Sequence, residues 1–285
     1  MVCKDFHQRC LSVSATLLLT LVFSAGILSP RTSFAQCKVV NNAFTDHETI
    51  DYDLYFQWGI LWKKIGEARF QTHATTYQSQ PAYKVDLLAA TGKSLDNIFK
   101  LRDTLSCYVT RDLVPLYFEK AAEEGKRYSV DAVTYSYSGG HPSVDQLRRR
   151  LGAEPYATHF EDTRCIYDMM SLIVRARNDN FSLTKPKDQV KLPLASGRRL
   201  DEVTLVYEGI KTIKGKDKHT YRCKVYRCLI LTERDDKAKE IMTFYVTDDE
   251  NCIPVMIDLA LNFGSAKAYL RSAQGTRHPI TSIVD

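Results

Sequence analysis

The sequence predicts a mainly β protein: a curved antiparallel sheet, either a half-barrel or an open barrel, with one main helix packed on it. Three observations lead to this fold class. Apolar and polar residues alternate with a period of two over many segments, turn-forming residues separate those segments, and a single segment has the period of a helix instead. Medium-length strands joined by short turns favour an antiparallel sheet that is heavily curved or closed.

Residues 1–35 have the features of a cleaved signal peptide. Lys4 and Arg9 precede the uncharged apolar run Leu11–Leu28, and Ser33-Phe34-Ala35 offers a small-x-small cleavage site that would leave Gln36 as the mature N-terminus. The run is about long enough to span a bilayer, but the helix-weakening residues at its end and the cleavage site favour removal over a permanent anchor. The sequence therefore predicts an exported, periplasmic protein.

Lipidation of Cys37 is the alternative, and it would leave the protein associated with a membrane. A lipoprotein signal places Gly, Ala or Ser before the modified cysteine, so Gln36 disfavours this route. No later segment reaches membrane-spanning length, and we expect no transmembrane segment in the mature chain. Residues 36–47 are expected to form a lead-in, residues 48–272 a single β-rich domain and residues 273–285 a C-terminal tail.

Charge and cysteine content exclude several classes of function. The formal net charge is +5 for the whole chain, and about +3 without the signal, which is too mild to indicate a nucleic-acid partner. Six cysteines follow the signal, so export permits disulfides whose pairing the sequence does not define. Cys223 and Cys228 would point to opposite faces of a strand because their spacing is odd. We expect no metal site and no cofactor.

The predicted strands follow one another with turn residues between them. The first, residues 51–58, carries on one face the apolar stripe Tyr52, Leu54, Phe56 and Trp58. The next is Ile65–Thr75, in which Phe70 lies on the apolar side. Further strands are expected at Ala82–Ala90, Lys100–Thr110, Pro115–Ala121, Arg127–Tyr137, Gln189–Leu194, Glu202–Glu208, Thr220–Thr232, Lys239–Val246, Ile253–Leu261 and Ser265–Arg271.

The segment Asp168–Arg177 breaks this pattern and predicts a helix. Asp168 can act as the N-cap by accepting the free amide of Ser171. An apolar stripe at helical spacing should lie on the sheet: Met169, Leu172, Ile173 and Ala176. Asp168 and Arg175 stand seven residues apart on one helical face, where they form either a buried polar pair or, alternatively, a cap and an exposed arginine.

Two other segments are less regular. Ser94–Phe99 is expected to form a short helical turn that Ser94 caps. Residues 138–164 are polar and contain the pair Gly139-Gly140, so we expect a mobile excursion between the two halves of the sheet.

Three adjacent acids, Asp248–Glu250, pose the question of a catalytic cluster, a calcium loop or a turn. An EF-hand needs alternating acids, a central glycine and a glutamate at the twelfth position, and none of these follows Asp248. Both flanks are strand-like, so the hairpin turn is the preferred interpretation. No nucleophile elbow or phosphate loop occurs, and the histidines are scattered. Cys165 precedes the helix, where a structural or disulfide-bonded cysteine is favoured over a free thiol of lowered pKa.

The late segment YVTDDENCIPVMIDLALNFGSAKAYL resembles the ending of the domain of unknown function 3108 family of exported Gram-negative envelope proteins. DYDLYFQWGILWKKIGEARFQ is similar to the opening strand pair of that family, and YDMMSLIVRAR to its helix. The family often has a Trp–Leu–Ser type of approach to the turn where this chain has Val246. The resemblance implies an exported β-rich protein without an established activity, and it supplies no catalytic residues.

The leading hypothesis is a non-catalytic envelope protein that binds an apolar ligand, such as a lipid, or a segment of a partner protein on the curved sheet. The residues expected to line that site are Tyr52, Phe56, Trp58, Phe70, Met169, Met170 and Leu172. One alternative is an envelope hydrolase acting on glycan or peptide, with carboxylates from neighbouring strands. Another is a scaffold that docks a membrane complex through a sheet edge.

Overall fold

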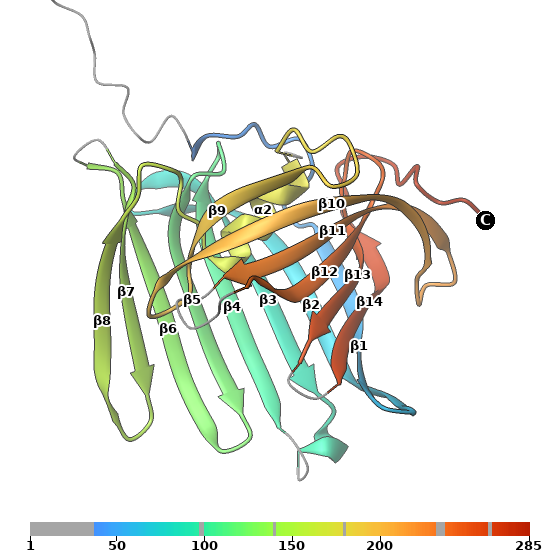
Figure 1. The fold of residues 1–285 in the computed structure, drawn as a ribbon, viewed down its shortest axis with the longest axis horizontal. Helices are drawn as coiled ribbons and strands as arrows, with labels where there is room; N and C mark the ends of the chain where they lie inside the picture. The colour runs from blue at the N-terminus through green and yellow to red at the C-terminus, as the bar shows by residue number, and fades with distance from the viewer. Residues whose placement is uncertain (1–36, 97–99, 139–140, 179–180, 232–236, 262–263) are drawn as a thin grey trace, which may run out of the picture. The chain divides into compact units, whose positions relative to one another are not determined.

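The first half of the fold is a meander of eight antiparallel strands (Figure 1). The computed structural model describes residues 37–96, 100–138, 141–178, 181–231, 237–261 and 264–285. Each strand of this half pairs with the next one in the chain. The strands are β1 (Thr49–Trp58), β2 (Leu61–Tyr77), β3 (Gln80–Thr91), β4 (Leu101–Thr110), β5 (Pro115–Glu124), β6 (Arg127–Ser136), β7 (Ser143–Arg150) and β8 (Ala153–Glu161).

The second half follows the α-helix α2 (Met169–Asn178) and meanders back toward the start of the chain. Its strands are β9 (Gln189–Ala195), β10 (Leu200–Lys214), β11 (Thr220–Leu231), β12 (Lys239–Thr247), β13 (Pro254–Ala260) and β14 (Ser265–Gln274). Because β14 pairs antiparallel with β1, the described strands form a single fourteen-stranded sheet. That sheet is not closed, since β8 ends it on one side and β9 on the other. The predicted fold class is confirmed.

The two halves of the sheet face each other with α2 between them (Figure 1). Met170 and Val174 belong to the cluster of buried side chains that includes Cys107 of β4 and Phe118 of β5. Leu172 belongs instead to a second cluster, with residues of β10 and β11. Helix α2 therefore separates two hydrophobic cores, and its side chains contribute to both.

Side-chain hydrogen bonds join the two halves near the open edge. Gln146 of β7 is buried; its Oε1 accepts the Gly197 amide at 2.7 Å, and its Nε2 donates to the Arg199 carbonyl at 3.1 Å. Gly197 has φ +84°, and a Cβ there would lie 3.2 Å from the Asp131 carboxyl carbon. Glycine thus allows the β9–β10 turn to approach the first half of the sheet.

The expectation for residues 138–164 was wrong, because β7 and β8 form a regular hairpin within them. Val144 and Gln146 of β7 are buried, but β8 is exposed along most of its length. The edge strand β8 pairs with β7 on one side only and covers little of the core. Such a strand can be polar throughout and shows little apolar alternation. The predicted turn at Ser94–Phe99 is present as the 3₁₀ turn η2 (Lys93–Leu95), with no side-chain cap; residues 97–99 lie outside the described part.

The expected hairpin around the three acids is confirmed by the pairing of β12 with β13. Cys165 forms a disulfide with Cys37, which attaches the lead-in to the segment before α2. The C-terminal tail is also attached, since Ile283 bridges Tyr221 and the Arg222 amide donates to the Ser282 carbonyl at 2.8 Å. None of the described helices is long and apolar enough to cross a membrane.

Candidate functional site

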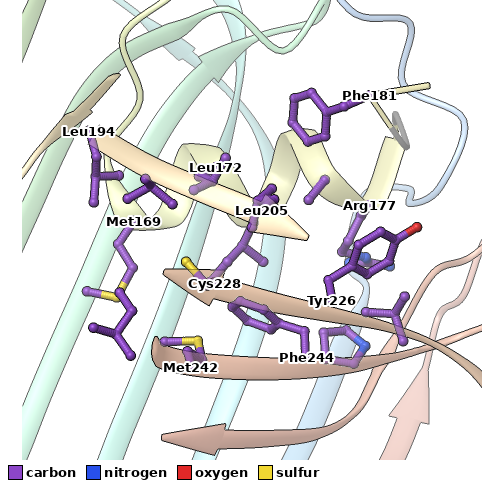
Figure 2. Close-up of a pocket in the computed structure, with 16 residues that line it drawn as sticks. Met169, Leu172, Arg177, Phe181, Leu194, Leu205, Tyr226, Cys228, Met242 and Phe244 are labelled. Carbon is purple, nitrogen blue, oxygen red and sulfur yellow. The ribbon is translucent and has the colours of Figure 1, made fainter. Parts of the chain in front are cut away.

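Two apolar cavities adjoin α2, and together they form the candidate site. The helix cavity, of about 160 Å³, lies between α2 and strands β10–β12. Figure 2 shows Met169 and Leu172 of α2 facing Leu205, Cys228 and Phe244 across this space. The sheet cavity, of about 320 Å³, lies between β1–β4 and β12–β14. Six of the described residues line both cavities, which are therefore neighbours: Met169, Ile173, Arg177, Met242, Phe244 and Pro254.

A buried cap fixes the beginning of α2. Asp168 Oδ1 accepts the amides of Met170 at 2.8 Å and Ser171 at 2.9 Å, as expected for an N-cap. Its Oδ2 accepts the hydroxyls of Ser171 at 2.7 Å and Tyr135 at 2.8 Å. Burial is the largest influence and raises the pKa of Asp168, although these hydrogen bonds oppose it. The contact with Tyr135 fixes the start of α2 on β6, and so sets the position of the cavity wall.

The two faces of α2 have different roles. Met170 and Val174 are fully buried against the first half of the sheet. The predicted apolar stripe of Met169, Leu172, Ile173 and Ala176 does not simply lie on the sheet, since all four residues line the helix cavity. Side chains on opposite sides of a helix are brought to different surfaces when the helix lies between two sheet halves.

An ion pair lies where the two cavities meet. Arg177 donates from Nη1 and Nη2 to Glu48 at 2.6 and 3.0 Å, and both side chains are almost completely buried. The guanidinium also donates to the Asn251 carbonyl at 3.0 Å and lies 5.6 and 5.9 Å from the rings of Phe44 and Phe70. A buried charge needs such partners to offset its desolvation. Arg177 thereby joins α2, the residue before β1 and the β12–β13 turn.

A row of alternating charges crosses the concave face beyond the apolar part of the sheet cavity. Lys120 of β5 lies 3.4 Å from Asp103 of β4, and both line that cavity. Lys120 pairs in register with Asp131 of β6, which Arg148 of β7 contacts at 2.7 and 2.8 Å. Burial raises the pKa of Asp103 and of Asp131, while Lys120 and Arg148 respectively oppose the rise.

The structure brings together some of the residues expected to line a site. Tyr52 and Phe70 line the sheet cavity, Met169 lines both cavities and Leu172 lines the helix cavity. Met170 is buried in the core and lines neither of them. Phe56 is half-buried and is not among the described lining residues of either cavity, and the side chain of Trp58 lies outside the described part.

The two residues of the expected polar pair have different partners. Asp168 contacts Ser171 and Tyr135, whereas Arg175 donates to the Tyr167 hydroxyl at 3.1 Å and lies over the Phe181 ring. Sequence reasoning missed Arg177, which the structure places between the cavities. Its partner Glu48 is 129 residues away along the chain. A charged residue within an amphipathic helix was the only signal, and it is a weak one because arginines are usually exposed.

One group of side chains has the types and proximity of metal ligands. Donor atoms of Asp46, His47 and His73 lie within 4.8 Å of one another. His47 and Asp46 are close to the surface, and Asp46 already accepts the Ala74 amide at 2.7 Å. Cys223 and Cys228 are buried in different clusters, and burial raises the pKa of both thiols to about 12. The thiolate that metal binding needs is therefore disfavoured at these cysteines.

Comparison with known proteins identifies the fold and a family without an assigned activity. The sequence model described as "Protein of unknown function (DUF3108)" matches residues 51–271. A crystal structure of a beta-barrel-like protein of domain of unknown function DUF1849 from Brucella abortus is similar, with a TM-score of 0.54 and 11% identity. The match covers 85% of this chain and 100% of that one, and at this identity it shows the fold alone.

A second solved structure is a "putative exported protein with YmcC-like fold" from Bacteroides fragilis NCTC 9343. Its TM-score is 0.34 at 9% identity, and the match covers 84% of this chain and 99% of that one. No curated protein matches this chain.

Proposed function

The chain belongs to the DUF3108 family of proteins of unknown function, and from this premise we propose that it is an exported, periplasmic, non-catalytic protein that binds an apolar ligand. The ligand is a lipid-like molecule with one apolar chain. The two neighbouring cavities around α2 carry this proposal. A cavity of about 150 Å³ holds a benzene-sized molecule, and ligand pockets begin at roughly 300 Å³. The helix and sheet cavities, of about 160 and 320 Å³, fall within this scale.

The lining supports an apolar chain rather than a polar substrate. Methionine, phenylalanine and branched aliphatic side chains surround both cavities, and Met169 and Met242 stand where the cavities adjoin. Methionine side chains adapt to irregular ligand shapes because they are unbranched and flexible. A chain that passes these two residues would occupy both cavities. Its polar end would then lie near Asp103 and Lys120, two of the charged residues that line the sheet cavity.

Blocking the cavities tests the proposal. Met169 is 38% exposed and lines both cavities, whereas Leu88, at 41%, is on β3 and outside the described lining of either cavity. Protein exported in bacteria and purified without detergent should retain lipid-like molecules in native mass spectrometry. Delipidated protein should take up a fluorescent fatty acid. Met169→Trp should weaken uptake by about tenfold or more through occupying the shared space, and Leu88→Trp should not.

Two results would refute a ligand-binding role: no uptake by the unmodified protein, or equal uptake by both tryptophan variants. Thermal unfolding of each variant establishes that the fold is intact. Met170→Trp adds a contrast, because that side chain is fully buried in the core. It should overpack and destabilise by about 1–3 kcal/mol.

A hydrolase is a second candidate, and one observation favours it. Asp103 and Asp131 lie on the concave face, two strands apart, and burial raises the pKa of each. Paired carboxylates with a raised pKa are typical of glycoside hydrolysis. Each of these aspartates already contacts a cation, Lys120 or Arg148, which supports a structural role instead. Turnover of peptidoglycan fragments that is abolished by Asp103→Asn without loss of stability would favour the enzyme.

A further inference from the structure

The β1–β2 hairpin ends in an exposed apolar tip. The sequence from residue 58 to 62 is WGILW. Trp58 and Trp62 are the only tryptophans in the chain. Gly59 makes the turn with φ +56°. Ile60 is fully exposed and Trp62 is 41% exposed. A long hairpin that carries large apolar side chains at its tip leaves apolar area in water, which is unfavourable unless another surface covers it.

Packing behind the tip holds Trp62 in one orientation. Its ring stacks on Tyr55, with centroids 5.1 Å apart and an interplanar angle of 13°, and meets Tyr269 edge-on at 6.1 Å. Lys216 lies 4.9 Å from the Tyr55 ring and 5.2 Å from the Tyr269 ring. Trp62 is thus fixed at the border between the sheet and the exposed tip. Tryptophan and tyrosine are enriched at the head-group level of membranes, because one part of the ring system is apolar and another part can bond to water.

A second apolar tip lies on the same edge of the sheet. Antiparallel pairing places the turns after β1, β3, β5, β7 and β13 at one edge, which is the lower edge in Figure 1. Leu151, in the β7–β8 turn, is highly exposed there. Exposed basic side chains accompany the two tips and the two turns between them, β3–β4 and β5–β6: Lys63, Lys93, Lys126, Arg127, Arg149 and Arg150. We call this set of turns the basic edge.

We propose that the basic edge docks on an anionic lipid bilayer, with Ile60 and its neighbours inserted among the head groups. Charge complementarity identifies the partner. Lysine and arginine match anionic lipid head groups, and the apolar tips between them match the acyl chains beneath those head groups. The tips come from separate hairpins of the sheet. A deformable bilayer can cover both, whereas a folded partner would need a matching pocket for each.

This docking would orient the sheet cavity toward the membrane. Leu101, the first residue of β4, and Ala266, the second of β14, line that cavity and lie at the basic edge. Lys120 also lines the sheet cavity, and together with Arg148 and Arg150 it lines a neighbouring polar groove. The docking nevertheless does not depend on ligand binding, since Ile60, Trp62, Leu151 and the exposed lysines and arginines of the basic edge are not among the described residues that line either cavity.

Vesicle binding tests the proposal with the mature chain. The vesicles contain either zwitterionic phospholipid alone or the same lipid with 30 mol% phosphatidylglycerol, a composition chosen as roughly that of an anionic leaflet. Both tryptophans lie in the hairpin, so intrinsic fluorescence reports on it directly. On anionic vesicles, the emission should shift to shorter wavelength and brominated acyl chains should quench it. High salt and Lys63→Glu should weaken binding, since surface charges are screened or reversed.

Ile60→Glu is the decisive variant, and Val40→Glu is its matched control. Ile60 is fully exposed, so the change should leave thermal unfolding unaltered. Val40 is 70% exposed and follows Val39, which bonds to Asp112 in the β4–β5 turn at the opposite edge. Ile60→Glu should reduce vesicle binding by about tenfold or more, because an apolar insertion is replaced by a charge of the wrong sign. Val40→Glu should bind as the unmodified chain does.

Three outcomes would overturn the proposal. The first is no co-sedimentation of the unmodified chain with anionic vesicles, and the second is equal binding by the two glutamate variants. The third is a dimer in vesicle-free solution that Ile60→Glu dissociates, because the tip would then be covered by a second copy. Fatty-acid uptake measured on Ile60→Glu should be normal, so failure of membrane docking is distinguished from failure of ligand binding.

Discussion

Arg177 and Glu48 form a bidentate ion pair in the interior, 2.6 and 3.0 Å between donor and acceptor atoms, across 129 residues of chain. The pair connects α2 to the residue that precedes β1, and Arg177 also reaches the Asn251 carbonyl. Since Arg177 lines both cavities, this contact sets how closely α2 approaches the two halves of the sheet.

Removing one partner of this pair should be strongly destabilising. Arg177→Met leaves Glu48 buried and unpaired, and we expect a loss of about 3–5 kcal/mol in the free energy of unfolding. Replacing both residues with apolar ones should cost less than the single change. Arg69→Met is the control, because Arg69 is half exposed beside Asp51 and its loss should cost about 1 kcal/mol or less. Urea unfolding measures all three, and similar losses for Arg177 and Arg69 would contradict the argument.

The β12–β13 turn should depend on its asparagine more than on its first acid. Asn251 is buried, and its side chain bonds the amide and carbonyl of His278 at 2.9 Å each. Asn251→Ala should destabilise by about 1–3 kcal/mol by leaving these groups unpaired. Asp248→Asn, which weakens partly exposed contacts with Arg222 and Lys224, should cost about 1 kcal/mol or less. Calcium should not raise the melting temperature of the unmodified chain or of Asp248→Asn. An increase in the unmodified chain that Asp248→Asn abolishes would support a calcium-binding loop instead of a simple turn.

Thiol counting tests the Cys37–Cys165 disulfide and the processing of the signal peptide together. Alkylation of the denatured mature chain should modify four cysteines before reduction and six afterwards. The intact mass should correspond to a chain that begins at Gln36, with no acyl chain on Cys37, whose sulfur is in the disulfide. Replacing Cys165 with serine should cost about 2–5 kcal/mol. A diacylated Cys37 would show instead that the protein is a lipoprotein.

The β7–β8 hairpin should give a pH-dependent signal at His159. Asp145, 2.8 Å from its Nδ1, and Glu161, 3.4 Å from its Nε2, raise the pKa of His159 above the ordinary value of 6.5. A histidine with a raised folded-state pKa stabilises the fold below its unfolded pKa, and this contribution is lost as the pH rises through the folded value. NMR titration should show a raised pKa that falls in Asp145→Asn. An identical titration in that variant would mean that the ion pair is absent in solution.

The sequence predicted most of this fold because its signals are local. Alternation with a period of two located twelve of the strands, and Asp168 identified the start of α2 because an N-cap bonds residues only two and three positions ahead. The hairpin at Asp248–Asn251 was predictable for the same reason. The hairpin of β7 and β8 was not, because an exposed edge strand does not need apolar alternation.

The sequence by itself therefore determined the type and order of the elements other than β7 and β8, and the apolar stripes of Tyr52, Phe70 and Met169. Only the tertiary structure decided which surface each stripe meets. A sheet that folds back over α2 places Met170 in a core and Met169 beside cavities, although the two are neighbours in sequence. It also brings Glu48 to Arg177. These contacts depend on the total twist and curvature of the fourteen strands. That total accumulates over the whole sheet, so a local sequence pattern does not define it.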